Sequence, residues 1–399
     1  MNTALSRLNP YPFDRLNKLL AKAVAADLSP ISLALGEPKH ATPAFLIDYM
    51  TNPDLIRTGL ATYPPTRGIP GLRQAISEFI ERRYPPAKIN PENEVLPVNG
   101  TREGLFSVAQ ALSEPLKRKH IILPNPFYQI YEGAAILAGC QPLYVNSHNS
   151  ASFKPDYNSI KPGTWDKVSI VYLCNPGNPH GSLLSVQELQ YLIERALEHQ
   201  FIIIADECYS EIYRDEALAP PGLLEASAKM GNIGHKQCLA FNSLSKRSNL
   251  PGLRSGYVCG DAQLIGSFLL YRTYHGSAMP IHNQLLSALA WSDEPHVILN
   301  RALYREKYTA FLDIVNDVWP MHQPEASFYL WPQTPYDDQD FTLNLFKKAN
   351  IRVLPGSYLA RTVGTENPGR NRVRLALVAE LDQCIQAAER IRDHWSRLC

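Results

Sequence analysis

The sequence predicts an α/β protein whose larger part is built on a mostly parallel sheet with helices on both faces. Three continuous apolar runs, at residues 120–123, 168–173 and 201–205, have the composition of buried strands. Between the second and the third, residues 186–200 place their apolar side chains at helical spacing. Buried strands that alternate with such helices are typical of parallel sheets covered on both sides.

Two weaker strand candidates, residues 238–241 and 257–259, extend this pattern. After them, the alternation of buried strands and helices ends. A long helix is predicted over residues 295–318, followed by short strands near 327–331 and 373–377 and helices near 341–349 and 381–392. We therefore predict a large domain over residues 46–290, a smaller α+β domain over residues 291–399, and an N-terminal segment, residues 1–45, that packs with the small domain.

Composition excludes several classes of function. The chain has 399 residues, enough for two or three domains, with 45% hydrophobic and 19% charged residues, as in soluble globular proteins. Its net charge of +1 argues against a nucleic-acid partner or a membrane surface recognised by bulk charge. No apolar run approaches the ~20 residues that span a bilayer. Small-molecule partners are expected instead.

Cysteine usage and the N-terminus point to the cytoplasm. The seven cysteines are scattered and form no Cys-x-x-Cys pair, so a disulfide framework or a structural metal site is not expected. Residues 1–7 lack the apolar core of a signal peptide. We therefore expect a cytoplasmic protein without bound metal.

Polar side chains follow the predicted strands, where open α/β sheets bind their ligands. One ligand could contact all of these loops because the carboxyl ends of parallel strands meet at one edge. The residues concerned are Asn125, Asn175, Asn178, Asp206, Ser243 and Lys246.

Lys246 is the most informative of them. It lies in Asn-Ser-Leu-Ser-Lys, and Arg254 follows eight residues later. A lysine amine attacks a carbonyl only when neutral, so it needs a site that lowers its pKa. Hydroxyl side chains before the lysine and an arginine after it suit a Schiff base with pyridoxal phosphate beside a bound phosphate group. Alone, a lysine in a serine-rich loop is more often a solvated surface residue.

Asp206 ends an apolar strand, and Tyr209 follows three residues later. A buried carboxylate is costly unless a cation pairs with it, and a protonated pyridine nitrogen would be such a cation. A helix N-cap is the competing explanation for Asp206, and ordinary core packing is the competing explanation for Tyr209.

Two loops could hold a cofactor. Gly100, Thr101 and Arg102 open an expected helix, where backbone N–H groups bind phosphate well, although simple capping would use the same residues. Asn178 lies in a proline-fixed loop directly after a strand, which would hold its amide rigidly, although turns of this composition are common.

Three further residues suggest binding roles. Arg374 lies in an apolar strand and needs an anionic partner, either a substrate carboxylate or an internal acidic residue. Tyr128 could stack on a flat cofactor. Tyr63 lies in a stiff Pro-rich loop.

Together, these segments resemble the class I/II aminotransferases, which have the fold-type I architecture of pyridoxal-phosphate enzymes. The resemblance covers nearly the whole chain, and its motifs occur in the family's order. They are the Tyr-x-x-x-x-Gly loop from Tyr63, Gly100-Thr101-Arg102, Pro126-Phe127-Tyr128, the Asn-Pro-x-Gly loop with Asn178, Asp206-x-x-Tyr209, Ser243-x-x-Lys246 with Arg254, and the late Arg374.

The resemblance implies a role for each matched residue. Lys246 would carry the cofactor pyridoxal 5'-phosphate and move a proton at the substrate Cα, with Asp206 on the pyridine nitrogen. Asn178 and Tyr209 would bond the phenolic oxygen, and Tyr128 would stack on the ring. The phosphate would be held by Gly100, Thr101, Arg102, Ser243 and Arg254, and Tyr63 would reach the neighbouring subunit's phosphate in a homodimer with shared sites. Arg374 would bind the substrate α-carboxylate, with the Gly36 backbone close by.

Within the family, the chain is most similar to the succinyldiaminopimelate aminotransferases of bacterial lysine biosynthesis. The similarity lies in residues 11–13, 35–40, 63–73, 246–254 and 354–359. It implies transfer of an amino group between N-succinyl-LL-2,6-diaminopimelate and 2-oxoglutarate. His180 departs from the threonine of many relatives. No motif identifies the residues that bind the succinyl group or the distal carboxylate, for which Lys39, Arg247 and Arg272 are cationic candidates.

Other functions remain open at this point. Another class I/II aminotransferase, acting on aspartate, acetylornithine or aromatic substrates, would use the same motifs, and so would a β-lyase or decarboxylase on this fold. A ligand-sensing domain of a transcription regulator is disfavoured because only about 45 residues precede the expected fold and they are not notably basic.

Overall fold

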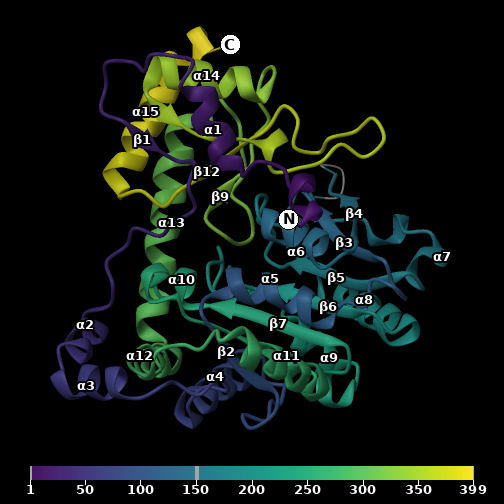
Figure 1. The fold of residues 1–399 in the computed structure, drawn as a ribbon. Helices are drawn as coiled ribbons and strands as arrows, with labels where there is room; N and C mark the ends of the chain where they lie inside the picture. The colour runs from purple at the N-terminus through teal and green to yellow at the C-terminus, as the bar shows by residue number, and fades with distance from the viewer. Residues whose placement is uncertain (1, 149–151, 399) are drawn as a thin grey trace.

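A computed structural model describes residues 2–148 and 152–398 of the chain (Figure 1). Its larger part contains a seven-stranded sheet in the order β2-β8-β7-β6-β5-β3-β4. The strands are β2 (Val95–Val98), β3 (His120–Asn125), β4 (Gln141–Asn146), β5 (Val168–Cys174), β6 (Ile202–Asp206), β7 (Cys238–Ser243) and β8 (Gly256–Gly260). β3 pairs in parallel with β4 and β5, and β5, β6 and β7 continue the parallel arrangement. β8 runs antiparallel to both of its neighbours.

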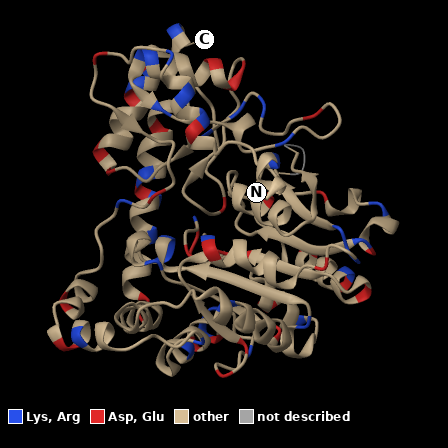
Figure 2. Ribbon diagram, viewed as in Figure 1, with Lys and Arg blue, Asp and Glu red and all other residues tan. Residues whose placement is uncertain are grey.

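Helices cover both faces of this sheet, which explains why its strands are apolar without alternation. On β6, Ile203 packs in a cluster with α4, α8, α9 and α12, whereas Ile202 and Ile204 pack on the other face with α5, α6 and α11. Figure 2 shows almost no charged residues on the central strands. These helices are α4 (Pro70–Arg83), α5 (Thr101–Leu112), α6 (Gln129–Leu137), α8 (Val186–His199), α9 (Leu223–Lys229), α11 (Ala262–His275) and α12 (Ile281–Ser292).

The smaller part has its own apolar cluster and two small sheets, ordered β11-β12-β9 and β1-β10. Its strands are β1 (Ile31–Ser32), β9 (Tyr329–Leu330), β10 (Ile351–Arg352), β11 (Leu354–Pro355) and β12 (Val373–Ala376). Its helices are α13 (Pro295–Val315), α14 (Asp338–Ala349) and α15 (Leu381–Leu398). α13 extends from the helices below the large sheet up into this part (Figure 1).

The N-terminal segment contributes directly to the smaller part, because β1 pairs in parallel with β10. Helix α1 (Pro12–Leu20) contacts α14 and β11 there. The chain then runs to the opposite end of the molecule, where α2 (Ala44–Met50) and α3 (Pro53–Ala61) contact α12.

Short elements complete the described chain. They are the helices α7 (Pro162–Trp165) and α10 (Leu244–Arg247) and the 3-10 turns Thr3–Arg7, Tyr157–Ser159, Ile233–His235, Pro251–Leu253 and Gly356–Tyr358. Within the described ranges, no helix combines the length and the apolar character needed to cross a bilayer.

The α/β architecture and its mostly parallel sheet confirm the predicted fold class. The five expected strands of the sheet are all present, whereas β2 and β4 were not expected. Each carries a proline in its interior or near its start, Pro97 and Pro142, which weakens the sequence signal of a strand. The domain limits at residues 45 and 290 stay predictions.

Candidate functional site

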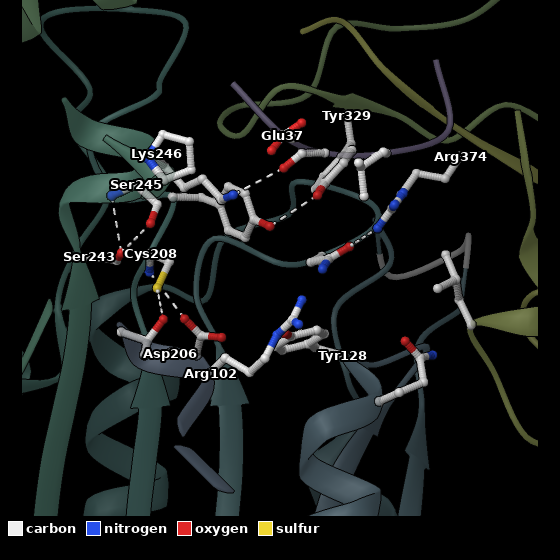
Figure 3. Close-up of a pocket in the computed structure, with 18 of the residues that line it drawn as sticks. Glu37, Arg102, Tyr128, Asp206, Cys208, Ser243, Ser245, Lys246, Tyr329 and Arg374 are labelled. Carbon is white, nitrogen blue, oxygen red and sulfur yellow. Dashed lines mark hydrogen bonds between the residues drawn. The ribbon is translucent and has the colours of Figure 1, made fainter. Parts of the chain in front are cut away.

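A cavity of about 490 Å³ opens between the carboxyl edge of the large sheet and the smaller part (Figure 3). It brings together residues from loops far apart in the sequence, as expected for this edge of an α/β sheet. The predicted site residues that line it are Gly36, Thr101, Arg102, Tyr128, Asn178, Asp206, Tyr209, Ser243, Lys246, Arg254 and Arg374.

Lys246 lies in the short helix α10, which begins directly after β7. Its Nζ donates a hydrogen bond to the Gly36 carbonyl at 3.0 Å and has no carboxylate in ion-pair contact among the described residues. Burial lowers the pKa of this amine to about 8. A substantial fraction is therefore neutral near physiological pH, which is the state that a nucleophilic amine requires.

Asp206 is buried at the end of β6. One carboxylate oxygen accepts a hydrogen bond from the Tyr131 hydroxyl at 2.6 Å, and the other accepts one from the Cys208 backbone N–H at 3.2 Å. Burial raises the pKa of Asp206 above its ordinary value, and no lysine or arginine forms an ion pair with it among the described residues. A cationic ligand group would compensate this buried carboxylate.

The start of α5 and the loop around Arg254 form an anion cradle. Gly100, with φ of 79°, is the N-cap residue of α5, and a Cβ built there would lie 2.2 Å from Arg254 Nη2. Glycine therefore lets the guanidinium approach the helix start. Ser243 Oγ donates to Ser245 Oγ at 3.0 Å beside it. Helix N–H groups, hydroxyls and an arginine without a carboxylate partner among the described residues suit a phosphate.

Arg102, beside this cradle in sequence, bonds another wall of the cavity. Its Nε donates to the Tyr128 hydroxyl at 2.8 Å, and the Tyr128 ring meets Tyr131 edge-on. Figure 3 shows Arg102 and Tyr128 side by side on one wall. The structure thus places Arg102 in the cavity, with its Nε bonded to Tyr128.

Arg374 lies on β12, opposite Asn178 and the N-terminal segment. Its Nη1 donates to Asn178 Oδ1 at 3.0 Å, and its Nη2 donates to the Ala34 carbonyl at 2.8 Å. The side chain is buried, its Nε has no hydrogen-bond partner, and no acidic residue pairs with it within the described ranges. A buried guanidinium held by neutral acceptors alone lacks the anion that would balance its charge.

The bond to Arg374 also fixes the orientation of the Asn178 amide. Because its Oδ1 accepts from Arg374, its amide N–H groups are oriented away from that contact. Asn178 Nδ2 donates no hydrogen bond to any described residue. The amide can therefore donate to a ligand while its oxygen holds the arginine.

Several cavity residues were given no role from the sequence. Tyr329 on β9 places its hydroxyl 3.0 Å from that of Tyr209, and Cys208 Sγ lies 3.1 Å from Thr101 Oγ1. The remaining ones are Tyr11, Phe13, Leu35, Glu37, Gln129, Ser245, Pro251, Leu354 and Leu359. Most of them lie in the segments that carry the family resemblance, residues 11–13, 35–40, 246–254 and 354–359, but no pattern there indicated a role for them.

Two predicted site residues lie outside the cavity lining. Gly100 borders the cavity through Arg254. The Tyr63 side chain is 98% exposed, so its expected reach into a neighbouring subunit stays a prediction.

The loops after β3 and β5 reach the cavity through Tyr128 and Asn178, whereas the side chains of Asn125 and Asn175 are bonded within the protein. Asn125 Nδ2 donates to Asn146 and to the Arg361 carbonyl. Asn175 donates to the Pro221 carbonyl and accepts from Leu184 N–H. Both amides therefore hydrogen-bond neighbouring loops of the protein.

The cationic candidates for a distal substrate group also lie outside the cavity lining. Arg247 is buried against Glu294 at 2.6 Å, and Arg272 is buried against Glu103 at 2.7 Å, so both have internal partners. Lys39 pairs with Glu37 at the surface, at 2.7 Å. Burial with a matched carboxylate identifies Arg247 and Arg272 as structural residues.

His180 is buried in the Asn178 loop. Its Nδ1 lies 2.8 Å from Ser182 Oγ, and burial lowers its pKa to about 3. It is therefore neutral at physiological pH and stabilises the loop.

The donor set of the cavity fits pyridoxal 5'-phosphate. An amine with a lowered pKa suits its aldehyde, the unpaired buried carboxylate of Asp206 suits a protonated ring nitrogen, and the cradle at Gly100 and Arg254 suits its phosphate. Thr101, Ser243 and Ser245 would add hydroxyls to the phosphate group.

Comparison with known proteins gives a consistent result. The sequence profile of the family described as "Aminotransferase class I and II" matches residues 29–391. The crystal structure of an aminotransferase from Neisseria meningitidis Z2491 is 46% identical, with a TM-score of 0.93 and full coverage of both chains. An LL-diaminopimelate aminotransferase of Dehalococcoides mccartyi is 29% identical over 96% of each chain. A "probable N-succinyldiaminopimelate aminotransferase" from Thermus thermophilus shares the fold, with a TM-score of 0.84, 23% identity, and coverage of 96% of this chain and 99% of that one.

The lowered pKa of Lys246 predicts a specific pH dependence. Cofactor attachment to the cofactor-free protein requires the neutral amine, so its rate should rise with pH and level off above about 8, where that amine is deprotonated. The measurement is the absorbance change on adding pyridoxal phosphate at a series of pH values. A rate that keeps rising toward pH 10.5, the ordinary lysine value, would contradict the burial argument.

Replacement of Arg247 should affect stability and leave substrate binding unchanged. Arg247→Ala removes the buried partner of Glu294 and should lower the free energy of unfolding by roughly 3 kcal/mol. The matched control is Arg392→Ala, which breaks the exposed pair with Asp393 and should cost at most about 0.5 kcal/mol. Urea unfolding measures both. A raised KM with unchanged stability would instead place Arg247 at the substrate.

Proposed function

Because the chain belongs to the class I and II aminotransferase family, we propose that it transfers an amino group between N-succinyl-LL-2,6-diaminopimelate and 2-oxoglutarate, with glutamate as the donor in reverse. The observation that carries this proposal is Arg374. It is buried in the same cavity as Lys246 and lacks an acidic partner among the described residues. An amino or oxo acid would supply the missing carboxylate, and a planar guanidinium binds it through two hydrogen bonds.

Pyridoxal phosphate, when bound, supplies an electron sink for charge that develops at the substrate Cα. Lys246 would hold it and, when free of it, would move a proton at Cα, because a pKa of about 8 lets a substantial fraction of the amine act as a base near neutral pH. Asp206 would keep the ring nitrogen protonated. Asn178 and Tyr209 would donate to its phenolic oxygen, and Arg374 would orient the substrate by its carboxylate.

The names of two relatives support a substrate with the diaminopimelate skeleton. The Dehalococcoides mccartyi relative is an LL-diaminopimelate aminotransferase, and the Thermus thermophilus structure has the succinylated compound in its name. The segments near Tyr11, Gly36 and Lys246, which carry the resemblance to succinyldiaminopimelate aminotransferases, all reach the cavity. Their place there supports the proposed substrate. Phe13 and Leu35, from the N-terminal segment, add apolar surface to the cavity that suits the methylene chain of such a substrate.

Unmodified LL-diaminopimelate is the second candidate. Glu37 lines the cavity, and its side chain is 45% exposed beside Lys39. A carboxylate there could pair with the distal ammonium group of LL-diaminopimelate. The succinyl amide lacks that positive charge, so pairing with Glu37 would favour binding of LL-diaminopimelate over the succinylated compound.

We also propose a cytoplasmic homodimer with shared sites. Tyr63 is almost fully exposed, and apolar side chains on α3 and α13 are exposed as well, including Leu60, Ile298 and Leu299. A second copy would cover this surface and bring Tyr63 to the partner's cofactor phosphate. The six described cysteines are all free, which suits a reducing compartment.

The substrate assignment is tested by half-reactions. Cofactor-loaded protein would be mixed separately with N-succinyl-LL-diaminopimelate, LL-diaminopimelate, glutamate, aspartate, acetylornithine and an aromatic amino acid. We expect the succinylated substrate and glutamate to convert the bound cofactor to its amine form, followed by absorbance. Lys246→Ala is the control and should abolish turnover.

The other outcomes of this measurement are equally informative. Faster conversion by LL-diaminopimelate would select the second candidate. Conversion only by another amino acid would keep the aminotransferase and reject the diaminopimelate skeleton. Release of ammonia and pyruvate would identify a lyase.

Arg374→Lys should weaken substrate binding selectively. Lysine keeps the charge but cannot bind a carboxylate in bidentate fashion. The loss of one charge-assisted hydrogen bond and the resulting misorientation of the substrate should lower kcat/KM by about 100-fold. Steady-state kinetics with the half-reaction substrates measures it. Arg352→Lys, on the exposed face of β10, is the control. A variant that kept wild-type kcat/KM would remove Arg374 from the carboxylate site.

A further inference from the structure

We propose that Tyr329 is a positioning residue that orients both Tyr209 and Arg374. Its hydroxyl bonds the Tyr209 hydroxyl, and its ring lies against the Arg374 guanidinium. One side chain would then align the group that contacts the cofactor's phenolic oxygen with the group that binds the substrate carboxylate. This inference rests on the proposed aminotransferase function.

The register of the small sheet places Tyr329 beside Arg374. Strand β9 pairs antiparallel with β12, and Tyr329 lies directly opposite Ala376. Arg374 is two residues from Ala376 and therefore points to the same face of the sheet. Tyr329 and Arg374 are thus diagonal neighbours, which lets long side chains touch. The Arg374 Cζ lies 4.4 Å from the centroid of the Tyr329 ring.

Tyr329 itself is held firmly. Its side chain is buried, and its backbone carbonyl accepts a hydrogen bond from the Tyr308 hydroxyl at 2.9 Å. Its ring meets Phe328 and Tyr209 edge-on. A rigid ring restricts the positions that the guanidinium can take, so Arg374 keeps its orientation without an acidic partner.

The hydroxyl contact has a direction once the cofactor is bound. Burial raises the pKa of both Tyr209 and Tyr329, so both phenols keep their protons, and one of the two hydroxyl groups donates to the other. An anionic phenolic oxygen on the cofactor is a stronger acceptor than a neutral hydroxyl. Tyr209 would therefore donate to the cofactor and accept from Tyr329, and that second hydrogen bond makes Tyr209 the better donor.

Gly36 joins this arrangement to Lys246. A Cβ at position 36 would lie 2.1 Å from the Tyr329 hydroxyl, so only glycine leaves room for the phenol. The carbonyl of the same residue accepts the hydrogen bond from Lys246 Nζ. Tyr329 thus packs against the backbone that holds the lysine. Figure 3 shows Lys246 and Tyr329 on the same side of the cavity.

A purely structural role for Tyr329 makes a different prediction. If the ring only fills space, phenylalanine should replace it without effect on the site. The hydroxyl matters only if Tyr209 depends on it, and the ring matters only if Arg374 depends on it. Two variants separate these roles: Tyr329→Phe keeps the ring and removes the hydroxyl, and Tyr329→Leu removes both.

The first readout is the pH midpoint of the absorbance change of the bound cofactor, without substrate. Donation by Tyr209 stabilises the negative phenolic oxygen and lowers the pKa of the lysine–cofactor linkage. Tyr329→Phe should weaken that donation and move the midpoint up by about half to one pH unit. Tyr157→Phe is the matched control, because the Tyr157 hydroxyl is buried in the core of the large part without a partner among residues 2–148 and 152–398.

The second readout is the affinity for glutarate, a dicarboxylate that has no amino group to react, measured by calorimetry on the cofactor-loaded protein. Tyr329→Phe should bind it as the wild type does, and Tyr329→Leu should bind it about tenfold more weakly. An unchanged pH midpoint in Tyr329→Phe would overturn the hydroxyl role even if Tyr329→Leu fails to fold. Wild-type affinity in a folded Tyr329→Leu would overturn the ring role.

These outcomes are distinguishable from failure of the proposed function. If wild-type protein shows no conversion by any amino acid in the half-reactions, the aminotransferase proposal fails. If wild-type protein converts and neither Tyr329 readout moves, only the positioning role fails.

Discussion

Charge burial without an internal partner is the constraint on which this cavity depends. Lys246, Asp206 and Arg374 are withdrawn from water by the sheet edge and by the smaller part, and each lacks an ion-pair partner among the described residues. Desolvation disfavours charge, so the pKa of the lysine falls and that of the aspartate rises. The fold tolerates this cost because neutral hydrogen-bond donors and acceptors hold each group in place. A cofactor with an aldehyde for Lys246 and a basic ring nitrogen for Asp206, together with a substrate that brings a carboxylate to Arg374, would give each of the three groups a partner.

The presence or absence of an internal carboxylate partner separates functional cations from structural ones. Arg247 and Arg272 are as deeply buried as Arg374, but each has a carboxylate within 2.7 Å. Their charges are balanced inside the protein and leave nothing for a ligand. Arg374 is held by two oxygens, the Asn178 amide and the Ala34 carbonyl, that carry no net charge. Ion-pair content thus distinguishes these arginines where burial alone does not.

Sequence reasoning identified the parts of the site that follow from chain order. Lys246 and Asp206 come directly after apolar strands, and the edge where parallel strands end is common to all of them, so their convergence could be predicted. Asn125 and Asn175 show the limit of this argument. Being placed at the same edge does not decide whether an amide faces a ligand or ties two loops together. That depends on partners such as Arg361 and Pro221, which lie far away in the sequence.

Tyr329 could not be predicted for a related reason. It lies in a run of aromatic residues that reads as ordinary core, and its contacts with Arg374 and Tyr209 depend on strand register and on how the two parts of the molecule meet. Among the hydrogen bonds that cross that junction at the cavity, two involve the strands of the small part. Asn178 bonds Arg374, and Tyr209 bonds Tyr329, each time with one residue from the large part and one from the small part. A displacement of the smaller part would therefore disturb the carboxylate site and the cofactor's phenolic contact together. Correct docking of the two parts is thus a condition for orienting substrate and cofactor at the same time.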